Sequence, residues 1–109
     1  MEHRHHVRIP IGIKTLIYRR GLPIATGRIR NGSRGGLFIE TECVEMGLHQ
    51  RVQCEVPVAE DAGAIGHCVS VRVVRQAPGG AGVELDEDDE PVAGSMLAYV
   101  TGDYPKSGA

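Results

Sequence analysis

Apolar and polar residues alternate along several short stretches of the chain, and turn-forming residues separate these stretches. Val52, Cys54, Val56 and Val58 occupy every second position of one stretch, with polar residues or proline between them. A period of two is typical of a β-strand that has one face in a core. The stretches of this kind are residues 9–18, 24–30, 36–41, 51–58, 65–75 and 81–85. They predict an all-β fold, a six-stranded antiparallel β-barrel over residues 9–86 that leaves few open edges.

The two ends of the chain depart from this period. Acidic residues precede Pro91, and both features favour the first turn of a helix. We therefore expect a short C-terminal helix over residues 90–100, in which Met96, Leu97 and Val100 cover one end of the barrel. Residues 101–109 are expected to form a frayed tail, and residues 1–8 a flexible basic arm.

Charge is distributed unevenly along the chain, whose 109 residues are expected to form a single domain. The formal net charge is −2, but residues 1–36 hold eight basic residues and one acidic residue, and the remainder holds four and thirteen. Such segregation predicts a positive face for an anionic partner. The acidic run at residues 85–90 either limits nonspecific association with nucleic acid or is a solvated loop.

No motif in the sequence indicates catalysis, since it contains no nucleophile elbow and no metal-ligand spacing. We expect neither an enzyme nor a cofactor. The histidines at positions 3, 5 and 6 lie in an exposed tail without a second shell, so no metal site is predicted. No apolar run approaches the roughly 20 residues that span a bilayer, and a cytoplasmic protein is expected. The three cysteines form no C-x-x-C pair, and we expect reduced, mostly buried thiols.

The stretch 28–36 combines arginines and glycines where one predicted strand gives way to the next. Asn31-Gly32 favours positive φ, so this pair and the glycines after it predict a tight hairpin turn. A turn does not require the three arginines of this stretch, and guanidinium groups beside exposed backbone N–H groups form an anion site. The sequence is consistent with both interpretations, a plain turn and an anion site.

Two short patterns frame the first two predicted strands. Arg4 and Arg8 form R-x-x-x-R before the first strand, and Asn31, Ser33 and Gly36 form [D/N]-x-S-x-x-G after the second. In this order, on an independently inferred β-barrel, the patterns resemble those of the PilZ family of bacterial cyclic di-GMP receptors. The family fold is a six-stranded antiparallel β-barrel with a following helix, and the GVEL segment at residues 82–85 also resembles the end of that barrel.

The resemblance implies a cyclic di-GMP site built from both motifs. Its ligand-binding residues are Arg4, Arg8, Asn31, Ser33 and Gly36. The arginines would bind the guanines and phosphates, and the other three would form the opposing surface. This is chemically reasonable, because a guanidinium can pair with guanine O6 and N7 or with phosphate, and a glycine allows close approach. Arg30 and Arg34 could add phosphate contacts, although the motif does not assign them.

The implied function is a non-catalytic receptor whose arm becomes ordered on the ligand and whose signal passes to an unidentified protein effector. Two alternatives stay open. One is a ligand-free PilZ-type adaptor. The other is a small barrel that binds single-stranded nucleic acid, but such barrels interleave aromatic platforms with cations, and here Tyr18 alone lies beside basic residues. We expect no membrane partner, and a monomer or weak homodimer.

Overall fold

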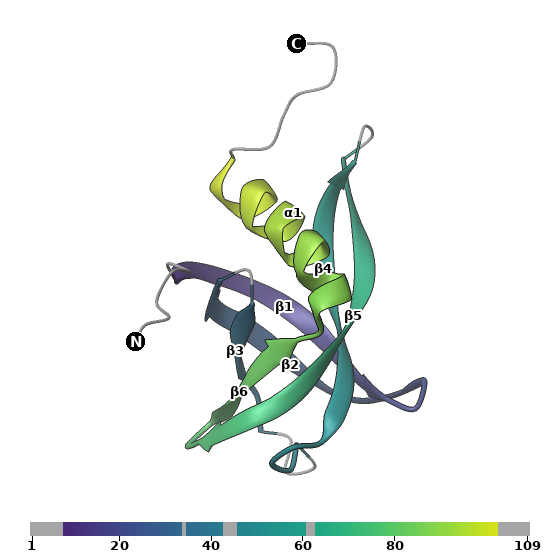
Figure 1. Cartoon of the computed structure of the whole chain (residues 1–109), viewed down its shortest axis with the longest axis vertical. Coiled ribbons are helices and arrows are strands. Elements are labelled where there is room, and N and C mark those ends of the chain that lie inside the picture. The colour runs from purple at the N-terminus through teal and green to yellow at the C-terminus, as the bar shows by residue number, and fades with distance from the viewer. Residues whose placement is uncertain (1–7, 34, 43–45, 61–62, 103–109) are drawn as a thin grey trace.

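Six strands and a C-terminal helix make up the chain in the computed structural model, which describes residues 8–33, 35–42, 46–60 and 63–102. The elements are β1 (Ile9–Arg19), β2 (Leu22–Gly32), β3 (Gly36–Glu40), β4 (Arg51–Glu60), β5 (Gly63–Ala77), β6 (Gly80–Leu85), the 3-10 turn η1 (Glu87–Asp89) and α1 (Glu90–Thr101). The strands close a barrel in the order β1-β2-β3-β6-β5-β4, with every neighbouring pair antiparallel (Figure 1). The predicted fold class is confirmed.

The core of the barrel consists mainly of branched aliphatic side chains, which come from alternate positions of the strands. The four alternating residues predicted to face inward on β4 are all buried. Val69, Val71 and Val73 of β5 are buried with them, together with Ile17, Ile29, Ile39 and Val83 from the other strands. A fully buried side chain of this size contributes about 1.5–3 kcal/mol. The core therefore fixes which face of each strand is turned outward.

The cysteines follow this division between faces. Cys54 is completely buried, and desolvation raises the pKa of its thiol to about 12, so it stays neutral and unreactive. Cys68 is exposed on β5. The expectation of mostly buried thiols is thus right for Cys54 and wrong for Cys68, which falls on the outward face, and Cys43 lies outside the described residues.

The barrel closes between β1 and β4 over a short distance, and a threonine extends this closure. The two strands share the pairs Ile17–Cys54 and Tyr18–Gln53. Beyond them the Thr15 hydroxyl donates to the carbonyl of Glu55 at 2.7 Å and accepts from its N–H at 3.1 Å. This side chain therefore replaces a backbone pair where the strands begin to separate.

The helix α1 packs against β4 (Figure 1). Ala93 and Met96 are buried, and Leu97 and Val100 pack around them, so the helix covers the barrel as expected. Asp89 precedes the helix, and its Oδ2 accepts from the Ser70 N–H of β5 at 2.9 Å. The start of α1 is thereby tied to the barrel. Within the described residues, no helix is both long and apolar enough to span a membrane.

Candidate ligand-binding site

A hydrogen bond joins the two sequence motifs on the outside of the barrel. Arg8 stands just before β1, and its Nε donates to the Asn31 Oδ1 of β2 at 3.0 Å, across 23 residues of sequence. The bond uses the Nε donor, so the terminal Nη groups of the guanidinium remain for a ligand. Asn31 thus binds the Arg8 side chain directly and orients its planar guanidinium group.

A β-bulge turns Asn31 toward the outer surface. Ile29 pairs with Ile39, whereas Asn31 pairs with Phe38, so Arg30 is an extra residue between the two pairs. Without this insertion Asn31 would share the core face of Ile29, two residues away. Arg30 instead lies 3.9 Å from Glu40 in an exposed ion pair and does not line the cavity described below.

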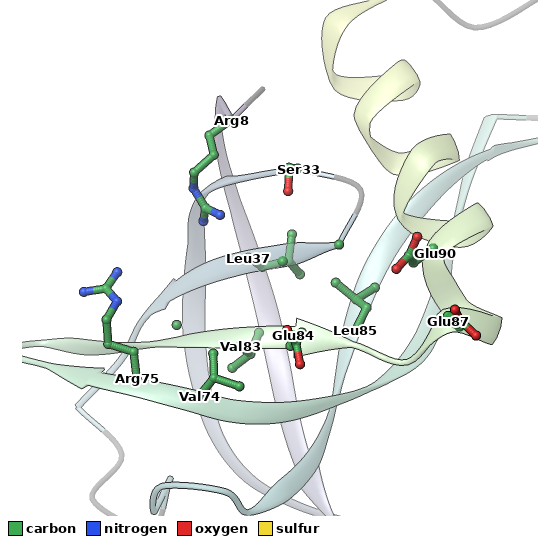
Figure 2. Close-up of a pocket in the computed structure, with 13 residues that line it drawn as sticks. Arg8, Ser33, Leu37, Val74, Arg75, Val83, Glu84, Leu85, Glu87 and Glu90 are labelled. Atoms are coloured by element: carbon green, nitrogen blue, oxygen red, sulfur yellow. The ribbon is translucent and has the colours of Figure 1, made fainter. Parts of the chain in front are cut away.

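Ser33 and Gly35, which lie between β2 and β3, are both hydrogen-bonded to the barrel. The Ser33 N–H donates to the carbonyl of Gly36 at 2.8 Å, and the carbonyl of Gly35 accepts from the Leu85 N–H of β6 at 3.0 Å. Ser33 is 5% exposed, and its hydroxyl oxygen is turned toward the cavity (Figure 2). Ser33 therefore presents its hydroxyl from a backbone position that is hydrogen-bonded to β3.

The glycines of this motif serve close packing, and the turn prediction for Asn31-Gly32 is wrong. Both residues belong to β2, and neither Gly32 nor Gly36 has a positive φ. A Cβ on Gly32 would lie 2.5 Å from Leu37 Cδ2. A Cβ on Gly36 would lie 3.2 Å from the carbonyl oxygen of Val83 and 3.7 Å from Arg8 Nη1. Gly36 therefore allows close approach to the β6 backbone, and Arg8 Nη1 lies at an ordinary contact distance from this position.

A second arginine, which sequence reasoning missed, lies on the same surface. Arg75 of β5 pairs with Gly82 of β6, and a Cβ on Gly82 would lie 3.5 Å from both Cβ and Nε of Arg75. Its Cζ lies 5.5 Å from the centroid of the Phe38 ring, a cation–π contact. A bulge between Val73 and Arg75 turns this side chain outward. The period of the strand puts Arg75 on the core face with Val73, so no sequence signal marks it.

These residues form a continuous row across four strands. Asn31 of β2 pairs with Phe38 of β3, Phe38 pairs with Gly82 of β6, and Gly82 pairs with Arg75 of β5. Arg8 bonds to the first residue of the row and Arg75 is its last. The sheet therefore holds two guanidinium groups over two glycines on one face.

A cavity of about 750 Å³ opens over this surface (Figure 2). Arg8 and Arg75 lie along one side. Gly36 of β3 and Gly82 of β6 line the cavity as well. Ser33 lines it as well, whereas Asn31 supports it through Arg8. The size falls within the range of small-molecule sites, and the donors suit an anionic ligand.

The opposite side of the cavity carries carboxylates. Glu84, Glu87 and Glu90 line it, the last from the first turn of α1. Glu84 forms an ion pair with Arg72 at 2.9 Å. The structure thus gathers Arg8, Ser33 and Gly36 around one space and links Asn31 to it. Arg4 and Arg34, both predicted to contact the ligand, lie outside the described residues.

Comparison with known proteins agrees with this geometry. The sequence profile of the PilZ domain matches residues 2–102. Among solved structures, the fold is similar to the Bacillus subtilis inhibitor of motility (MotI/DgrA), with a TM-score of 0.67 and 13% sequence identity. The match covers 94% of this chain and 52% of that one, so the chain spans about half the length of that protein. A search of curated protein sequences gives no match. On the strength of the profile match and the barrel, the chain belongs to the PilZ domain family, a family of cyclic di-GMP receptors.

Proposed function

We infer that this chain is a non-catalytic receptor that binds cyclic di-GMP in the cavity between Arg8 and α1 and passes the signal to a protein partner. The observation that supports this proposal is the 3.0 Å hydrogen bond from Arg8 to Asn31, which connects one residue of each family motif. PilZ domains are generally non-catalytic receptors that act in the cytoplasm, and we propose both properties for this chain.

The chemistry of the ligand matches the donors on this surface. Cyclic di-GMP carries two phosphate groups and two guanines. The Nη groups of Arg8 and the guanidinium of Arg75 can pair with phosphate oxygens or with guanine O6 and N7. Because Gly36 is only half-buried and has no side chain, a planar base can approach the sheet closely there. The Ser33 hydroxyl supplies a further polar contact.

Transmission of the signal follows from where the cavity lies. Its lining comes from the start of β1, from β3, β5 and β6, and from the first turn of α1. A ligand that contacts Arg8 and the helix at the same time connects segments that the described structure leaves separated by the cavity. Because a ligand favours the arrangement it binds best, occupancy changes the surface that β1 and α1 present to an effector.

Isothermal titration with cyclic di-GMP, and with GTP as a competitor of similar chemistry, tests this proposal. We expect saturable binding selective for the cyclic dinucleotide. Arg8→Ala should weaken it by at least about tenfold, since hydrogen bonds to charged groups contribute about 1.5–3 kcal/mol. Arg20→Asn is the matched control. It removes a cation at the far end of β1, and asparagine tolerates the φ of 54° found there.

Three other outcomes would each contradict this proposal. Equal losses in Arg8→Ala and Arg20→Asn would show that only net charge matters and would contradict the assigned site. If cyclic di-GMP gave no binding heat at several temperatures, and a protein partner were recovered equally well with and without the nucleotide, the ligand-free adaptor would be favoured. Tight binding of an oligonucleotide with a steep salt dependence would favour the nucleic-acid barrel.

A further inference from the structure

The carboxylates on the α1 side of the cavity are not explained by anion binding. A dianionic ligand should avoid them, yet Glu90 lines the same cavity as Arg8 and Arg75. Figure 2 shows its side chain directed into the cavity, whereas Glu87 points away from Arg8. Glu84 is paired with Arg72. Of the three, Glu90 is thus the carboxylate that a ligand would meet.

Glu90 is also held firmly and without a partner among the described residues. It is half-buried, and no hydrogen bond or ion pair to its carboxylate is formed within ranges 8–33, 35–42, 46–60 and 63–102. The helix that carries it is fixed by buried Ala93 and Met96 and by the bond from Ser70 to Asp89. The carboxylate therefore stands on a rigid element, as a specific contact requires.

Stabilisation of the helix is the ordinary reason for an acid in this position. A negative charge in the first turn contributes about 0.3–1 kcal/mol through the helix dipole. Three acids immediately before Glu90 already supply negative charge there, namely Glu87, Asp88 and Asp89. The dipole accounts for acids in this turn, but it does not account for a side chain that extends into a cavity lined by arginines.

The polarity of guanine gives a reason for such an arrangement. One edge of the base presents the acceptors O6 and N7, which suit a guanidinium. Another edge presents the N1–H and N2–H₂ donors, which suit an ionised carboxylate because that group only accepts hydrogen bonds. Adenine has an acceptor at N1 and no amino group at C2. A cavity with guanidinium groups on one side and a carboxylate on the other is thus complementary to guanine and not to adenine.

We propose that Glu90 is a specificity-determining residue that accepts hydrogen bonds from N1–H and N2–H₂ of one guanine of the ligand. This inference rests on the proposed function. The phosphates then face Arg8 and Arg75, and the base extends toward α1. A bound base covers this half-buried carboxylate, which then has to be paired, and an analogue lacking the N–H donors is rejected; Glu90 thereby makes the receptor selective for guanine.

The test compares three cyclic dinucleotides by isothermal titration on the whole chain. Cyclic di-GMP is set against its inosine analogue, which lacks only the N2 amino group, and against cyclic di-AMP. For the wild type we expect the inosine analogue to bind at least about tenfold more weakly and cyclic di-AMP more weakly still. Glu90→Gln should weaken cyclic di-GMP by about tenfold and bring the ratio of guanine to inosine affinities close to one. Asp88→Asn, which removes an acid from the same turn but does not line the cavity, is the matched control and should leave that ratio unchanged.

Each outcome decides a separate question. If Glu90→Gln keeps the wild-type ratio, or strengthens all three ligands equally because a repulsive charge is gone, this inference is overturned while the receptor function stands. If the wild type does not bind cyclic di-GMP, the receptor function fails and the inference fails with it. Glutamine preserves the size of the side chain, and an unchanged thermal unfolding midpoint shows that α1 is intact.

Discussion

Two arginine–glycine stretches connect strands in this barrel, and their glycines have different structural roles. Between β1 and β2, Arg20 and Gly21 have φ of 54° and 81°, and a Cβ on Gly21 would meet nothing within 4 Å. Between β2 and β3, Gly32 and Gly36 have no positive φ, but a Cβ on either would crowd the barrel. The first pair makes a tight turn in open space. The second brings backbone and side chains close together beside the cavity that Arg8 and Ser33 line.

The largest expected effect comes from filling the crowded position. In Gly32→Ala the added methyl would lie 2.5 Å from Leu37 Cδ2, 3.0 Å from the Gly36 carbonyl and 3.3 Å from Ile11 Cδ1. Leu37 is 1% exposed and cannot move away without disturbing the core. We expect the free energy of unfolding to fall by about 1–3 kcal/mol in urea denaturation, the usual effect of overpacking.

The corresponding change at the open turn serves as its control. Gly21→Asn keeps a residue that tolerates positive φ and has room for its side chain, so the expected change is within about 0.5 kcal/mol. Equal losses in the two variants would mean that both glycines act through backbone conformation, and the contrast between the two stretches would be wrong.

A smaller effect is expected from the hydrogen bond that connects the motifs. Asn31→Leu removes the acceptor for Arg8 Nε while keeping a side chain of similar length. We expect cyclic di-GMP affinity to fall by about fivefold, since one such bond contributes about 1 kcal/mol and the guanidinium loses its fixed orientation. Titration calorimetry measures the change.

The matched variant at this position is Asn31→Asp, which keeps an acceptor oxygen for the arginine. It should bind the ligand within about twofold of the wild type, because the family motif allows either residue. If Asn31→Asp loses as much affinity as Asn31→Leu, the Asn31 amide contacts the ligand with its own donor group, and orientation of Arg8 is not its main role.

The sequence was sufficient to predict the barrel because a period of two is a direct consequence of strand geometry. The inward residues of β4 follow from it. The C-terminal helix was predicted separately, from Pro91 and the acidic residues before it, and the order of the strands around the barrel was not predicted. The contact between Arg8 and Asn31 was not predicted, because the motifs imply only that the two residues bind the same ligand from opposing sides. What that contact does to a ligand stays a prediction.

The β-bulges are what the period could not predict. Asn31 and Arg75 each lie two residues beyond a core residue, Ile29 and Val73, and strict alternation puts both inside the barrel. One inserted residue in each strand reverses this. Whether a bulge forms depends on contacts with the neighbouring strands, so the alternation of apolar and polar residues along one strand does not predict it. Arg75 was missed for this reason, and Asn31 was assigned to a turn.

The smallest expected effect tests this second, unpredicted arginine. Arg75→Lys keeps the positive charge but loses the planar group that lies 5.5 Å from the Phe38 ring, and lysine offers no bidentate fork. We expect cyclic di-GMP affinity to fall by about threefold in titration calorimetry. Arg51→Lys is the control, since Arg51 forms an ion pair with Asp86 at 2.7 Å and does not line the cavity. A loss confined to Arg75→Lys would show that the bulge in β5 brings a planar guanidinium to the ligand. Unchanged affinity in both variants would mean that Arg75 does not contribute to ligand binding, which would then depend on the two family motifs. Arg75 would in that case only pack against Phe38.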